Sequence, residues 1–137
     1  AECSLESFSV GQNFSLQRFR LMTAMLDTLQ LHFDGRYATQ YILRTDFKKT
    51  GSVYTDTENL INECQRIETI QAAALFVETD DGRIKCSLRS RDSIDVRKIA
   101  QKYDGGGHKM AAGLHLKGPL KAAMKTIAAE IKKQLKK

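Results

Sequence analysis

The chain has 137 residues, which is long enough for one domain, or for one domain with an arm. Its formal net charge of +6 favours anionic partners such as nucleotides. Its 42% hydrophobic and 28% charged residues, with a single proline, exclude a disordered chain. No apolar run could span a membrane, and Glu2 and Glu6 interrupt any signal-peptide core, so we expect a cytoplasmic protein without membrane contact, unless a leader has been removed.

The apolar pattern predicts short helices and strands along the whole chain after residues 1–14, which show no clear period and suggest an arm. The predicted elements are, in order, a helix at 16–31, a turn at 33–36, a strand at 37–43, a helical turn at 45–51, a helix at 54–67, strands at 72–78 and 83–90 joined by a hairpin turn at 80–83, a helix at 95–103, a strand at 111–116 and a helix from 118. This order indicates an α+β fold, in which a small mixed β-sheet packs against helices and an N-terminal helix or linker arm precedes it.

Local patterns refine these expectations. Thr55 and Glu58 have capping-box spacing, although Glu58 could instead contact a ligand, and Asp95 is placed to cap the next helix. The run at 72–78 is apolar throughout, which is typical of a central strand. The strand at 83–90 alternates, and the side chains expected on its polar face are Arg83, Lys85, Ser87 and Arg89.

The chain has three cysteines, which are Cys3, Cys64 and Cys86. Their odd number and their wide spacing in sequence disfavour disulfides and zinc sites. Cys64 and Cys86 lie at apolar-periodic positions, so we interpret them as reduced core residues.

The lysines after residue 120 mostly follow the outside of the last predicted helix, which is typical of a solvated face rather than of a nucleic-acid contact.

The stretch "DGGGHKMAAG", residues 104–113, concentrates four glycines around His108. Three consecutive glycine amides without side-chain cover could form an anion-binding nest, and His108 could donate to a phosphate or stack on a base. A helix C-cap explains Gly105 alone. The pattern matches neither a P-loop nor a dinucleotide-binding fingerprint.

Arginines at the end of the preceding strand strengthen the ligand hypothesis. Arg89 could form a bidentate phosphate clamp beside the glycines, or it could lie on a solvated strand face. For Arg91 the solvated role is favoured.

These motifs together resemble the C-terminal substrate-binding domain of DHH phosphoesterases, called DHHA1. The motifs that carry the resemblance, from about residue 14 to the end, are Ser87-Leu88-Arg89-Ser90, Asp95-Val96 with Ile99-Ala100, Gly105-Gly106-Gly107-His108, and Ala111-Ala112-Gly113. The segments at 29–38 and 55–62 also fit the oligoribonuclease branch, whose enzymes degrade very short RNAs from an end and dephosphorylate phosphoadenosine phosphate. The resemblance implies that residues 1–31 are a linker or the end of a catalytic domain, and that residues 32–137 are the DHHA1 domain.

The resemblance also implies a division of labour. The family's catalytic half holds two manganese ions with an Asp-His-His motif, which this chain lacks, so we expect no catalytic or metal-binding residues and no cofactor in the chain itself. The implied substrate-binding residues are Arg89, Ser90, Gly105, Gly106, Gly107 and His108. The implied partners are short RNA or a nucleotide phosphate and the DHH catalytic domain of the same protein, and a homodimer is left open.

Three alternatives stay open at this point. The same domain could serve a cyclic-dinucleotide phosphodiesterase or an exopolyphosphatase-like relative. It could also be a non-catalytic RNA-binding or assembly module, like the related domain of alanyl-tRNA synthetases; His108 with the Ala-Ala-Gly that follows favours the phosphoesterase branch.

Overall fold

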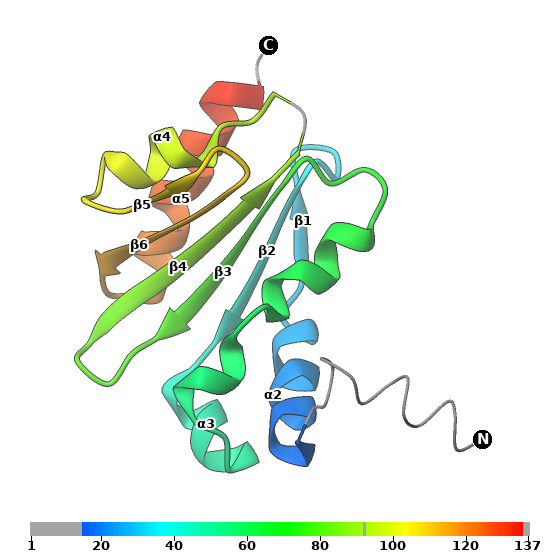
Figure 1. The fold of residues 1–137 in the computed structure, drawn as a ribbon, viewed down its shortest axis with the longest axis vertical. Helices are drawn as coiled ribbons and strands as arrows, with labels where there is room; N and C mark the ends of the chain where they lie inside the picture. The colour runs from blue at the N-terminus through cyan, green and yellow to red at the C-terminus, as the bar shows by residue number, and fades with distance from the viewer. Residues whose placement is uncertain (1–14, 92, 136–137) are drawn as a thin grey trace.

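The computed structural model describes residues 15–91 and 93–135, which form a six-stranded mixed sheet with helices on both faces (Figure 1). The strands are β1 (Gln30–His32), β2 (Tyr37–Ile42), β3 (Ala72–Glu78), β4 (Arg83–Ser90), β5 (Gly106–His108) and β6 (Ala111–Lys117). The helices are α2 (Leu16–Leu26), α3 (Arg44–Thr50), α4 (Val96–Gln101) and α5 (Leu120–Leu135), with 3₁₀ helices η1 (Tyr54–Thr57) and η2 (Leu60–Arg66). The predicted α+β class is confirmed.

The strand order is β1-β2-β3-β4-β6-β5, and only the β2–β3 pair is parallel. A parallel pair needs a crossover between its strands, and α3, η1 and η2 supply it here. β3 lies inside the sheet and Ala72 to Val77 are buried, as the uniformly apolar run predicts. β1 and β5 are the two edge strands.

Separate hydrophobic cores fill the two faces of the sheet. One core packs α4 and α5 against the side of β4 that carries Cys86 and Leu88. The other packs α2 and η2 against the opposite side, with Leu21 and Met25 fully buried. Cys64 and Cys86 are free and buried, so their predicted core role is confirmed, while Cys3 lies outside the described residues.

The second face is covered over only part of its width. α2 and η2 pack against β2 and β3 on this face, whereas no described helix lies in front of β4, β6 and β5 in Figure 1. On the opposite side, α4 and α5 cover these same strands. The uncovered half exposes one alternate set of side chains from each of three adjacent strands.

Two predicted helices and one predicted helix cap differ from the structure. The first helix ends at Leu26, because the chain turns and β1 begins at Gln30. The predicted helix at 54–67 is two 3₁₀ helices separated at Asn59, which has a left-handed φ of 63°. The capping contact there comes from Asp56, which accepts from the Val53 N–H at 2.8 Å, so the predicted Glu58 cap is wrong.

Most of the other predicted elements match the structure closely. Asp95 caps α4 by accepting from the Lys98 N–H at 3.2 Å, and Gly51 closes α3 with a φ of 70°. α2 contributes Leu21 and Met25 to the core of the same sheet, and the domain boundary after residue 31 stays a prediction. Within residues 15–91 and 93–135, no helix has the length and apolar character needed to cross a bilayer.

Candidate functional site

The uncovered half of the sheet brings together residues from three strands. Antiparallel partners point to the same face, so the register defines the set. Arg89 pairs with Ala111, which pairs with His108, and Ser87 pairs with Gly113, which pairs with Gly106. We call this surface the open face, and its members are Lys85, Ser87, Arg89, Gly106, His108, Ala111, Gly113 and His115.

Arg89 is held on the open face by its neighbours. Its Nε donates to Asn62 Oδ1 at 3.2 Å, and its Nη1 donates to the Leu88 carbonyl at 3.0 Å. Its Nη2 has no protein acceptor among the described residues. Partial burial lowers the pKa of the guanidinium, which nevertheless stays charged. A half-buried, oriented guanidinium with a free nitrogen can bind a phosphate oxygen without first losing its rotamer freedom.

His108 lies on the same face as Arg89, on the other side of Ala111. Two strand spacings separate their backbones, about 10 Å in all. His108 is exposed, and Ala111 between them is small. A ligand lying over Ala111 could therefore contact the guanidinium on one side and the imidazole on the other.

The glycine run is a strand rather than the predicted loop. Gly105 donates its N–H to the Ala100 carbonyl at 2.8 Å, and residues Gly106–His108 pair with β6, so the run is not a nest of three free amides. The left-handed residue after α4 is Asp104, with a φ of 62°, rather than a glycine. As an edge strand, β5 pairs with β6 on one side only, so the backbone groups along its other side have no strand partner.

The three glycine positions differ in whether the fold could accommodate a side chain. A Cβ on Gly105 would collide with the Gly113 carbonyl. A Cβ on Gly107 would lie 2.5 Å from the Ala111 carbonyl oxygen, and Gly107 has a φ of 141°. A Cβ on Gly106 would meet nothing within 4 Å and would point into the open face. The fold requires Gly105 and Gly107, whereas Gly106 only leaves the surface bare.

Gly113, beside Gly106, also has no side chain of its own on the open face. A Cβ on Gly113 would lie 2.6 Å from Lys85 Nζ, so the ammonium lies over the backbone of β6. Lys85 and Gly113 are candidate site residues that the sequence motifs did not indicate. The alternation of β4 already placed Lys85 with Arg89, but no local pattern predicts that Gly113 pairs with Gly106.

Ser90 does not lie on the open face. It follows Arg89 in an extended strand, so it points to the helix-covered face, where it is only 4% exposed. Its hydroxyl donates to the Ile94 carbonyl at 2.8 Å and lies 3.3 Å from the Lys109 carbonyl. Through these contacts Ser90 links the loop after β4 to the β5–β6 turn. A substrate bound on the open face could not contact Ser90, because its side chain lies on the helix-covered face.

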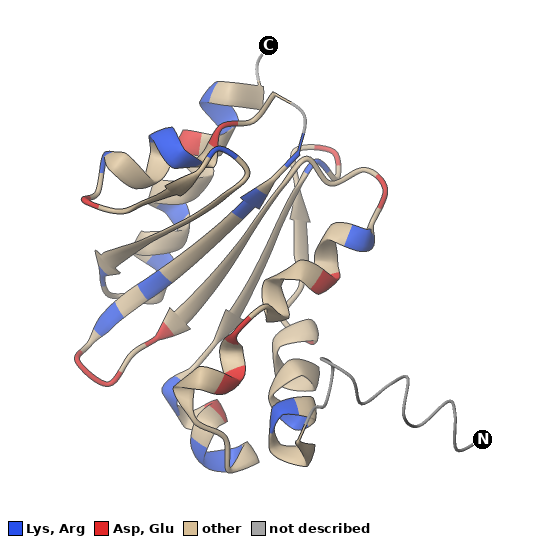
Figure 2. Ribbon diagram, in the orientation of Figure 1, with Lys and Arg blue, Asp and Glu red and all other residues tan. Residues whose placement is uncertain are grey.

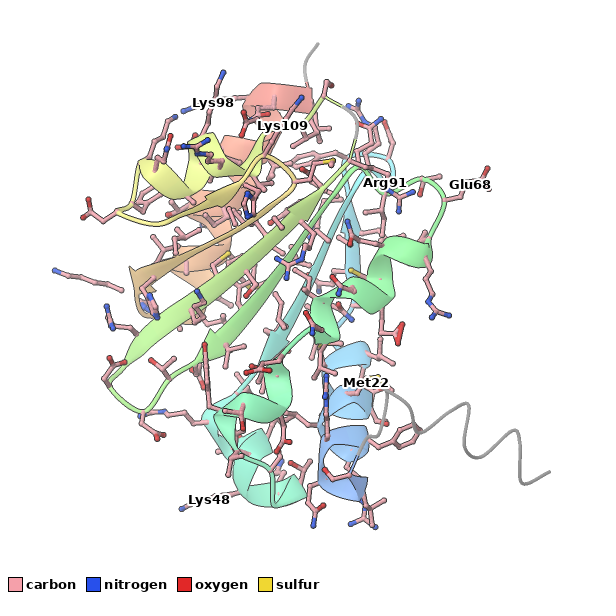
Figure 3. All side chains as sticks on the ribbon, in the orientation of Figure 1. Met22, Lys48, Glu68, Arg91, Lys98 and Lys109 are labelled. Carbon is pink, nitrogen blue, oxygen red and sulfur yellow. The ribbon has the colours of Figure 1, made fainter. Side chains whose placement is uncertain are left out.

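Charge is unequally distributed along the open face. Figure 2 shows basic positions along β4 and acidic positions at the β3–β4 turn. Arg91, which follows β4, and Lys109, in the β5–β6 turn, lie at the end of the sheet near Arg89 and His108 (Figure 3). The Arg89 end is therefore the electropositive end, suited to an anion.

The described residues provide no metal centre. Across residues 15–91 and 93–135, His, Cys, Asp and Glu side chains form no group of three that could hold a metal ion. His32 is close to Thr39 Oγ1, 2.8 Å from its Nε2, and burial lowers the pKa of its imidazole. The residues present therefore do not fit the two manganese ions, which the family resemblance assigns to the catalytic half.

Comparison with known proteins identifies the family. The DHHA1 domain family matches residues 34–137. The chain belongs to the DHHA1 domain family. This assignment agrees with the resemblance carried by the glycine, arginine and histidine motifs.

Curated relatives of this DHHA1 domain include bifunctional oligoribonucleases and PAP phosphatases. The chain is 33% identical over 110 residues to the bifunctional oligoribonuclease and PAP phosphatase NrnA of Bacillus subtilis, covering 80% of this chain and 34% of that protein. It is 31% identical over 100 residues to the NrnA of Thermus thermophilus, covering 73% and 29%. The chain thus spans about a third of the length of these relatives.

Solved structures share the fold. An exopolyphosphatase-related protein from Bacteroides fragilis matches with a TM-score of 0.85 at 24% identity, over 97% of this chain and 39% of that one. The pGpG-specific phosphodiesterase PggH from Vibrio cholerae matches with a TM-score of 0.60 at 12% identity, over 85% and 38%. At these identities the likeness concerns the fold of the DHHA1 domain alone.

Proposed function

We propose that this DHHA1 domain is the substrate-binding half of a DHH phosphoesterase that hydrolyses short oligoribonucleotides from an end, phosphoadenosine phosphate, or both. The observation that carries the proposal is the alignment of Arg89, Gly106 and His108 on one face of the sheet without a helix over it. The NrnA relatives bear the names of these two activities, which supports the choice of substrates.

Each residue has a distinct role in this proposal. Arg89 binds a phosphate of the nucleotide through its free Nη2, and Asn62 keeps the guanidinium in place. Gly106 lets the ligand approach the backbone, because no side chain stands above it. His108 donates a hydrogen bond to the same nucleotide or stacks on its base. Ser90, Gly105 and Gly107 support this surface from within the fold.

Hydrolysis is assigned to a separate DHH catalytic domain of the same protein. Two manganese ions bound there would activate water, and the residues described here form no group of three that could hold a metal ion. The DHHA1 domain contributes by positioning the substrate, an effect that can account for a large share of an enzymatic rate. The chain is therefore expected to bind without hydrolysing, with or without manganese.

Calorimetric titration of the chain with phosphoadenosine phosphate and with RNAs of two to five nucleotides tests the proposal. Arg89→Ala and His108→Ala should each weaken binding roughly 10-fold, since each removes one charged or polar contact. Lys48→Ala is the control, because Lys48 is an exposed cation on α3, far from the open face (Figure 3). Unchanged affinity in both site variants, with circular dichroism showing a native fold, would contradict the site.

Ligand length separates the proposal from an RNA-binding or assembly module. A substrate-binding domain for very short RNA should prefer RNAs of two to five nucleotides over a long structured RNA. A module for folded RNA should instead prefer the long RNA and lose affinity steeply with salt, because it neutralises many phosphates. The second result would favour the module.

A further inference from the structure

A cavity adjoins the open face, at the end opposite to Arg89. It has a volume of about 720 Å³, which lies in the range of small-molecule sites. It lies beside the β3–β4 turn, between that turn and the segment from α3 to η1. We call it the β3–β4 cavity, and the lining residues that matter here are Phe47, Tyr54, Glu78, Asp80, Lys85 and His115.

The cavity is continuous with the surface that carries Arg89. A shallow groove of about 300 Å³ runs beside η1, and its lining includes Arg89, Ser87 and Asn59. Tyr54 and Lys85 line both the groove and the β3–β4 cavity. Arg89 and Lys85 are four residues apart on β4, or about 13 Å, so a ligand that fills both ends must be longer than a single phosphate group.

Lys85 marks the middle of this path. Its ammonium lies over Gly113, in the row of Ser87 and Gly106, and so leans from the cavity toward Arg89. A cation in this position suits an internal phosphodiester between the two ends. His115, the strand partner of Lys85, lies on the cavity side, where burial and the neighbouring Lys85 lower the pKa of its imidazole.

The lining of the cavity favours a nucleobase over a second phosphate. Phe47 and Tyr54 offer aromatic rings, and Tyr54 is 46% exposed, so its ring is available for stacking. Glu78, Asp80 and Asp81 also border the cavity, and their carboxylates would repel a phosphate. The same carboxylates can accept hydrogen bonds from the exocyclic amine of a base.

The acidic border is held by the protein itself. Glu78 Oε1 accepts from the Arg44 N–H at 3.1 Å, and Asp81 Oδ2 accepts from Arg83 Nε at 3.0 Å. Hydrogen bonds from Thr79 and Arg83 lower the pKa of Asp81 to about 2, so this carboxylate is charged at neutral pH. The charge pattern thus reverses along the face, from basic at Arg89 to acidic at the β3–β4 turn (Figure 2).

We infer that the β3–β4 cavity binds the base of a second nucleotide, with Tyr54 stacking on it, when a dinucleotide lies along the open face. The terminal phosphate then lies at Arg89 and His108, the linking phosphodiester lies near Lys85, and an amine-bearing purine enters the cavity. This inference rests on the proposed function, and it adds a reason for a preference for dinucleotides over mononucleotides.

Calorimetry with adenosine monophosphate and with the linear dinucleotide pApA tests the inference. The wild-type chain should bind pApA more tightly than the mononucleotide. Tyr54→Ala should weaken pApA binding roughly 5- to 100-fold, the usual range for loss of one base–aromatic stack, and leave mononucleotide affinity unchanged. Tyr54→Phe, which keeps the ring, should bind pApA like the wild type. Phe19→Ala is the matched control, because it removes an aromatic ring of α2 that is 53% exposed and lies outside the cavity.

The outcomes distinguish this inference from the proposed function. If neither ligand binds the wild-type chain, the proposed function fails and the inference fails with it. If both bind and Tyr54→Ala changes neither affinity, or weakens both equally, the inference is wrong while the proposed function stands. If pUpU binds as tightly as pApA, the preference for an amine-bearing purine is wrong.

Discussion

Arg89 and Ser90 are consecutive residues whose side chains lie on opposite faces of β4. Arg89 is half-buried on the open face, where it bonds Asn62, and Ser90 is buried among the loops beside α4. The SLRSR stretch thus carries two separate functions. One residue faces the proposed ligand, and the other holds together the loops that shape the neighbouring β5–β6 hairpin.

Ser90→Ala should therefore reduce stability without reducing affinity. Loss of the hydroxyl leaves the buried Ile94 carbonyl without its donor, which costs about 1–2 kcal/mol of unfolding free energy. Urea unfolding measures the first effect and phosphoadenosine phosphate titration the second. If the Ser90→Ala chain were folded but bound the nucleotide as weakly as Arg89→Ala, Ser90 would have to be part of the binding site.

Gly106→Ala and Gly107→Ala should separate binding from folding. Gly107→Ala forces a Cβ against the Ala111 carbonyl at a left-handed φ, so we expect a loss of about 2–3 kcal/mol in unfolding free energy. Gly106→Ala meets open space and should unfold like the wild type, yet weaken nucleotide binding by covering the bare backbone. A Gly106→Ala chain with unchanged affinity would mean that the ligand does not approach this backbone.

Asp95→Ala should destabilise α4 and the strand that follows it. The Asp95 carboxylate accepts from the Lys98 N–H, and loss of such a cap costs about 1 kcal/mol. The backbone of Asp95 keeps its two bonds to Gln134, at 2.7 and 2.9 Å, so the helix should remain in place. Asp95→Asn is the control, because asparagine caps as well as aspartate does. Equal unfolding midpoints for Asp95→Ala and wild type would contradict the cap.

Glu130→Gln should lower stability in a pH-dependent way. A hydrogen bond from Lys102 at 2.8 Å lowers the pKa of the Glu130 carboxyl below its ordinary value of 4.5, and a bond from the Tyr103 hydroxyl helps. Since the folded pKa is the lower one, the stabilisation is complete above pH 4.5 and disappears as the pH falls through the folded value.

Urea unfolding at pH 7 and at pH 3 measures this effect. The difference between Glu130→Gln and wild type should be larger at pH 7 and shrink at pH 3. Glu63→Gln is the control, because the Glu63–Arg66 pair at 3.3 Å is exposed and should contribute little at either pH. A difference that stays constant from pH 7 to pH 3 would show that the Glu130 charge does not contribute.

The sequence by itself determined most elements and which side chains each buries. Period-2 alternation in β4 and the apolar stripe of α5 depend on local geometry, so they can be recognised without a partner. The motifs were likewise sufficient to recognise the family, since Arg89 and His108 lie within short, specific sequence patterns. The 3₁₀ geometry at 54–67 was not predicted, because its buried residues Leu60, Ile61 and Cys64 fit the period of an α-helix equally well.

Tertiary structure alone decided what the glycines do. Strand β5 exists because β6 pairs with it, and neither three glycines nor a histidine predicts a strand from local preference. The same pairing aligns Arg89, Ala111 and His108, which are up to 22 positions apart, and leaves their face without a helix. Register between strands depends on contacts distant in sequence, so the composition of the open face follows from the folded sheet and not from any single segment.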